Sequence, residues 1–177
     1  MTDTRATDRP PPWRLGGAVL VALALLLAPA ARAAMDAQAF VDVAARDGML
    51  LVEMSQQALD RTPGDEVAAL ATAVIADHRT NAIILGGIAE RKGFDLPTDL
   101  DEAQSKALAE MGGAPIDGFA PLYVRLQVEA HQKAIHDMQR YVAEGDDADL
   151  KSFAEDTLRT LKGGLRDAEA LEKKLAG

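Results

Sequence analysis

Three histidines are the residues of this 177-residue chain whose type and spacing could support chemistry, because the chain contains no cysteine. His78 and His131 each belong to a stripe of apolar residues at helical spacing, so both are expected to face the protein interior. His136 shares its side of the helix with charged residues and is expected on the surface: Arg125, Glu129, Lys133 and Arg140. Neutral imidazole binds Zn, Cu, Fe and Ni, so His78 and His131 are candidate ligands of one transition-metal ion.

Two carboxylates complete the candidate site. Glu53 flanks the apolar face of the first predicted helix and would balance the charge of an ion. Asp77 precedes His78 and would either support a metal-bound imidazole by a hydrogen bond or lie exposed. The structural alternative is that a histidine on an apolar face is a core residue satisfied by one hydrogen bond. The candidate metal ligands are therefore Glu53, His78 and His131, with Asp77 as the candidate hydrogen-bond partner of a metal-bound imidazole.

Long amphipathic segments must position these side chains. Alanine and leucine dominate the apolar residues and aromatic residues are only 4%, which favours helices over strands. Asp36 and Asp117 are expected N-caps, and a shorter helix is expected over 100–111. The long helices are expected over the ranges 36–61, 65–92, 118–144 and 149–175. The pattern predicts an all-α four-helix bundle with a short extra helix in its crossover.

The first 33 residues have the pattern of a signal peptide. Three arginines precede an unbroken apolar run over 18–28, and the small-residue sequence Ala31-Arg32-Ala33 follows Pro29. The alternative is a membrane anchor, but the run is shorter than the roughly 20 residues that span a bilayer. We therefore expect cleavage before Ala34, a bundle domain over 34–177 without a membrane span, and a periplasmic or secreted protein.

Charge and motifs exclude several function classes. The net charge is −9, and removing the first 33 residues, with four arginines and two aspartates, makes it −11. So acidic a protein is a poor candidate for binding nucleic acid. Nucleophile elbows, phosphate loops and zinc-protease helices are absent from the sequence, so no catalytic residue is predicted and an enzyme is the least favoured class. A protein partner or a homo-oligomer remains open, since the third long helix is apolar over much of its surface.

Several short segments occur in an order that resembles a known family. They are Phe40-Val41, Ala44-Ala45 and Glu53, then Ala76-Asp77-His78, Leu96-Pro97, Gly113-Ala114-Pro115-Ile116-Asp117 and His131, and finally Phe153-Ala154 and Thr157-Leu158-Arg159-Thr160-Leu161. In this order they resemble the exported bacterial proteins of the domain-of-unknown-function (DUF) 4142 family, often labelled predicted outer membrane protein. The resemblance covers about Phe40 to Leu171 and implies a ferritin-like bundle.

The resemblance also implies a cluster of one glutamate and three histidines, of which this chain lacks one. The family's last motif ends in a histidine, and Gly164 stands at that position. A site with three ligands and an open position can still bind a metal, whereas a site that has lost its function would bind none. Di-iron chemistry is not expected, because Ile75 and Val128 stand where a Glu-x-x-His pattern needs glutamate. The prediction is an exported bundle binding one Zn, Cu, Ni or Fe ion, or alternatively a metal-free envelope, stress or interaction protein.

Overall fold

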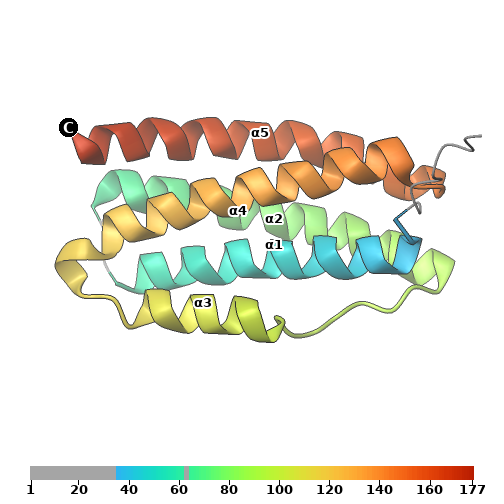
Figure 1. Cartoon of the computed structure of the whole chain (residues 1–177), viewed down its shortest axis with the longest axis horizontal. Helices are drawn as coiled ribbons and strands as arrows, with labels where there is room; N and C mark the ends of the chain where they lie inside the picture. The colour runs from blue at the N-terminus through green and yellow to red at the C-terminus, as the bar shows by residue number, and fades with distance from the viewer. Residues whose placement is uncertain (1–34, 62–63) are drawn as a thin grey trace, which may run out of the picture. The chain divides into compact units, whose positions relative to one another are not determined.

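A computed structural model describes residues 35–61 and 64–177 of the chain, and this part is helical with short connections (Figure 1). The signal peptide predicted over 1–33 and its cleavage site before Ala34 lie outside the described residues. Within those residues the helices are α1 (Ala37–Asp60), α2 (Asp65–Lys92), α3 (Glu102–Gly112), α4 (Ile116–Glu144) and α5 (Ala148–Ala176). The expected helices, including the short one in the crossover, are confirmed.

The four long helices form a bundle in which each packs against two neighbours. α1 packs against α2 and α4, and α5 packs against α4 and α2, so α2 and α4 lie diagonally across the core. Figure 1 shows α1 and α2 as one antiparallel pair and α4 and α5 as another. The connection after α2 and the short α3 lead the chain back along the bundle, with α3 beside α1 and α4. One long crossover of this kind is the connectivity of ferritin-like folds.

Local sequence signals set most of the helix ends. The carboxylate of Asp36 accepts a backbone hydrogen bond at the start of α1, and Asp101 caps α3 with a reciprocal capping box. Gly93 ends α2 in the left-handed conformation, with φ of 74°, which costs glycine little. The expected cap at Asp117 is wrong: α4 begins at Ile116, with Pro115 in the cap position. Asp117 lies instead in the first turn, where its carboxylate faces the positive end of the helix dipole.

The core is apolar along the bundle and contains a few polar side chains. Phe40 stacks on Tyr141 with ring centroids 3.9 Å apart, which joins α1 to α4. Further along the same pair of helices, the Ser55 hydroxyl lies 2.9 Å from the Tyr123 hydroxyl and accepts a hydrogen bond from Gln127. Among the described helices, none has both the length and the hydropathy needed to cross a membrane.

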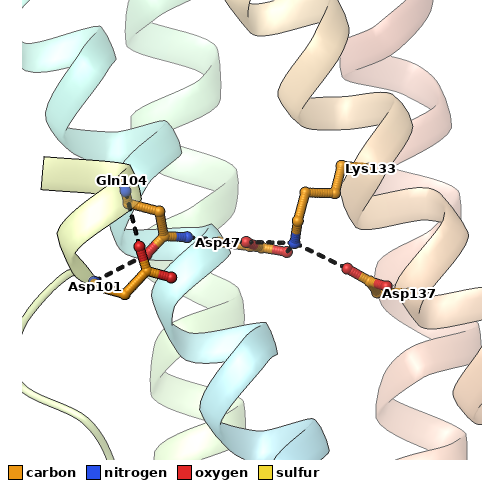
Figure 2. Close-up of polar contacts among 5 residues, drawn as sticks. All are labelled: Asp47, Asp101, Gln104, Lys133 and Asp137. Atoms are coloured by element: carbon orange, nitrogen blue, oxygen red, sulfur yellow. Dashed lines mark hydrogen bonds and ion pairs between the residues drawn. The ribbon is translucent and has the colours of Figure 1, made fainter. Parts of the chain in front are cut away.

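A buried carboxylate attaches α3 to the bundle (Figure 2). The Asp47 side chain on α1 is almost fully buried, and the Lys133 ammonium on α4 donates to both of its oxygens, at 2.8 and 3.0 Å. Gln104 on α3 donates to the same carboxylate at 3.1 Å, while its amide oxygen belongs to the capping box at Asp101. Lys133 also contacts Asp137 at 2.9 Å. Burial raises the pKa of Asp47 above its usual value in spite of the ammonium beside it.

Removing the ammonium should therefore leave a buried carboxylate without a counter-charge. We expect Lys133→Met to destabilise the fold at pH 7 by about 2–4 kcal/mol. The deficit relative to the unmodified protein should shrink at pH 5, because Asp47 then protonates more readily in the folded state than in the unfolded state. Urea unfolding, monitored by circular dichroism at both pH values, measures the free energy of unfolding of the variant and of the unmodified protein.

Two further variants control this experiment. Adding Asp47→Asn to Lys133→Met should recover stability at pH 7, because the buried charge is gone. Lys162→Met, at an exposed position of α5, should change little. An equal, pH-independent loss in the single and double variants would contradict the interpretation.

Candidate functional site

His78 and His131 meet at the centre of the bundle. Their ring centroids are 5.8 Å apart and the rings are nearly perpendicular, at 77°. Only 6% of His78 and 2% of His131 is exposed, as their apolar stripes predicted, whereas His136 is exposed. His78 comes from α2 and His131 from α4, so this contact joins the two diagonal helices across the core.

A backbone carbonyl fixes the proton position on His131. Its Nδ1 lies 2.8 Å from the carbonyl oxygen of Gln127, one turn earlier in α4. A carbonyl only accepts, so Nδ1 carries the hydrogen and the neutral ring has its lone pair on Nε2. The His78 ring makes no hydrogen bond with any residue in the described part of the chain. His78 also lines a cavity, where a water molecule or an ion can serve as its partner.

Gly164 is the residue that lets the His131 ring fit against α5. A Cβ atom at this position would lie 2.5 Å from His131 Nε2, which would force the ring or the helix to shift, and 3.0 Å from its Cδ2. The neighbouring Gly163 differs, since its Cβ would meet only the end of the Arg166 side chain, at 3.8 Å. Sequence comparison identified Gly164 only as a missing ligand; the structure adds that the space of its side chain is occupied by the imidazole.

Burial keeps both histidines neutral at pH 7. Desolvation, with a smaller contribution from His131, lowers the pKa of His78 from 6.5 to about 4. Desolvation also lowers the pKa of His131, although its hydrogen bond to Gln127 and the charge of Asp77 act in the opposite direction. Neutral imidazole is the form that can bind a metal ion. The pair therefore offers two uncharged nitrogen ligands at physiological pH.

The predicted carboxylates do not join the histidines in the interior. Glu53 is exposed on α1 and lines the same cavity as His78. Asp77 is exposed on α2 and acts on His131 through its charge. In the ranges 35–61 and 64–177, no three histidine, aspartate or glutamate side chains are close enough to share a metal ion. The metal site of Glu53, His78 and His131 stays a prediction, and the structure brings together two of its three ligands.

A cavity of about 310 Å³ opens beside His78, and sequence reasoning missed it. Small residues on facing helices leave this space, including Gly48 on α1, Ala82 on α2 and Ala134 on α4. Asn81 also lines it, and its Nδ2 is buried without a hydrogen-bond partner among the described residues. The cavity walls are mainly apolar. Clustered alanines and glycines were a visible signal, but spacing alone does not show which of them face one another.

The pKa of His78 predicts how stability depends on pH. Because the unfolded histidine takes a proton near pH 6.5 and the buried one only near pH 4, its contribution is present above pH 6.5 and lost as pH falls. From pH 7 to pH 5 this loss amounts to about 2 kcal/mol. His78→Gln should reduce the pH dependence by that amount in urea unfolding, whereas His136→Gln on the surface should not. Equal pH dependence in His78→Gln and the unmodified protein would refute the buried, neutral state.

The two adjacent glycines of α5 predict opposite effects of the same substitution. Gly163→Ala should stabilise the protein by about 0.5–1 kcal/mol, because alanine is the better helix former. Gly164→Ala should destabilise it by about 1–3 kcal/mol, because the His131 ring must move. Chemical denaturation of both variants measures the difference. If Gly164→Ala is as stable as Gly163→Ala, the ring does not occupy this space.

Comparisons with known proteins place the chain in a family. A family model described as "Domain of unknown function (DUF4142)" matches residues 23–171. Among curated proteins nothing matches. The solved structure "Crystal structure of DUF305 fragment from Deinococcus radiodurans" is similar to this chain with a TM-score of 0.69 and 15% identity, and the alignment covers 80% of this chain and 99% of that one. At this identity the likeness shows the fold alone. Since the family model spans most of the sequence, the chain belongs to the DUF4142 family.

Proposed function

We propose that this protein is an exported bundle that binds one transition-metal ion, Zn, Cu, Ni or Fe, through His78 and His131. The observation that carries the proposal is the pair of buried, neutral imidazoles with ring centroids 5.8 Å apart. His78 has no hydrogen-bond partner in the described part of the chain. A bound ion would give the His78 ring a partner and take up the free lone pair of His131, whose Nδ1 already donates to Gln127.

The two histidines meet part of what a metal site requires. Histidines that bind metals usually donate their other ring N–H to a carbonyl or carboxylate, as His131 does to Gln127. Two imidazoles fall short of the three or four protein ligands of typical sites. Glu53 is the candidate for a third ligand, because it lines the same cavity as His78. Solvent would occupy the remaining positions, and no chemical step is assigned to the ion.

A metal-free bundle is the second candidate, and Gly164 favours it. The Nε2 face of His131 lies against the α5 backbone at the position of this glycine, where the family resemblance implies a fourth ligand. In this account the two imidazoles fill the core by packing edge to face. The protein would then act without catalysis in the cell envelope, in stress protection or by contact with a protein partner or a second copy.

Export to the periplasm is part of both candidate functions. It is supported by the arginine-rich start, the apolar run over 18–28 and the small residues before Ala34. The acidic composition also speaks against nucleic acid as a partner.

Metal analysis of the exported protein separates the two candidates. The protein is isolated from the periplasm without chelator or histidine tag. Its intact mass should be that of a chain beginning at Ala34. Mass spectrometry should then find close to one transition-metal ion per chain. His78→Ala and His131→Ala should each remove it, because each takes away one of two imidazoles, whereas His136→Ala on the surface should retain it.

The opposite result favours the metal-free bundle. A folded protein that contains no metal, and takes up none when titrated with Zn, Cu, Ni and Fe(II), would rule out the metal site. Metal retained in both core variants would place any ion elsewhere in the chain.

A further inference from the structure

The cavity beside His78 has the size and walls of a small-molecule site. Its volume of about 310 Å³ lies at the lower end of the range of ligand pockets, roughly 300–1,000 Å³. It is also about twice the roughly 150 Å³ engineered cavity that holds benzene. The lining side chains from α4 and α5 are apolar apart from Thr157, and include Ala134, Met138 and Leu161. An apolar molecule would therefore be removed from water on several sides.

Among the residues that line this cavity, Asn81 has a buried polar atom without a partner. The Nδ2 atom of Asn81 on α2 is buried and makes no hydrogen bond with any described residue. Leaving a buried donor unpaired is unfavourable, and an acceptor atom on a bound molecule would remove that cost. The amide thus selects a ligand that carries an acceptor such as a carbonyl oxygen.

Charge at the edge of the cavity argues against an acid as the ligand. Asp47 and Glu53 both border the cavity, and Arg79 is the cation among its lining residues. Asp47 already has Lys133 as its counter-charge. The chain as a whole carries a net charge of −9. A neutral molecule enters such a site without the repulsion that a carboxylate would meet.

We propose that this cavity binds a small, neutral, mainly apolar molecule with one acceptor oxygen, which Asn81 recognises. The site is bounded by α1, α2 and the connection after α2, where Leu96 and Pro97 line it. This connection is held to α1 by Gln38, whose amide exchanges two hydrogen bonds with the Asp95 backbone, at 2.8 and 3.0 Å. The proposal goes beyond metal binding and holds for the metal-free protein, since Asn81 and the apolar walls supply the contacts.

A fluorescent naphthyl ketone, 6-propionyl-2-(dimethylamino)naphthalene, tests the proposal on chelator-treated protein. It is neutral, apolar and carries one carbonyl. We expect one molecule bound per chain with blue-shifted emission and a dissociation constant of roughly 10–100 µM. Ala134→Leu, which fills the cavity from α4, should weaken binding at least about tenfold by removing that volume. Ala143→Leu, exposed on the same helix, is the matched control and should bind normally.

The role of Asn81 is tested with a second probe that lacks the carbonyl. Asn81→Leu should weaken binding of the ketone about fivefold or more, because the hydrogen bond is lost. It should leave binding of 2-(dimethylamino)naphthalene nearly unchanged, and a substitution that only disturbs the fold would weaken both probes.

Three results would overturn the proposal. They are no binding by the folded protein, binding that Ala134→Leu leaves intact, and equal losses of both probes in Asn81→Leu. If Ala134→Leu does not fold by circular dichroism, Ala45→Leu, at a half-buried lining position of α1, reduces the same cavity. Metal content measured on the same variants distinguishes ketone binding from metal binding. Ala134→Leu should lose ketone binding and keep any metal. His131→Ala should lose the metal and keep ketone binding.

Discussion

The contact between the His131 imidazole and the α5 backbone at Gly164 is the constraint on which the centre of this bundle depends. With no Cβ at this position, α5 approaches the ring where a Cβ would lie 2.5 Å from Nε2. The Gln127 carbonyl holds the opposite side of the ring, so its orientation and proton position are both fixed. The His78 ring, from α2, packs against the His131 ring with 77° between the two ring planes. The absence of a side chain at Gly164 therefore gives the His131 ring its place against α5, from which it contacts His78.

Polar groups inside an acidic protein are accommodated in two different ways. The histidines avoid the cost of buried charge by staying neutral, because desolvation lowers the pKa of each. Asp47 is also buried, and the Lys133 ammonium and the Gln104 amide both bind it. That contact attaches α3 to α1 and α4, next to the cavity that Asp47 also lines. The histidine pair, the buried carboxylate and the cavity are thus neighbouring parts of one region.

Helical spacing and end signals predicted the fold well, because apolar periodicity and caps are local properties of the sequence. The inward direction of His78 and His131 followed from the same periodicity. Asp47 was missed, although it continues the core series of α1, Phe40, Ala44, Leu51, Met54 and Ala58, at the spacing of a buried position. Its counter-charge lies 86 residues away, on a helix whose register against α1 no local pattern gives. The cavity and the fit of His131 against Gly164 depend on packing between helices for the same reason.

The central claim is that His78 and His131 form a buried, neutral pair with the His131 proton on Nδ1. Long-range ¹H–¹⁵N correlation spectra of the histidine side chains, recorded from pH 7 to pH 5, measure this directly. We expect that the His78 ring stays neutral throughout, that neutral His131 carries its hydrogen on Nδ1, and that through-space contacts connect the two rings. A charged His78 ring near pH 6, or a neutral His131 with its hydrogen on Nε2 facing α5, would contradict it.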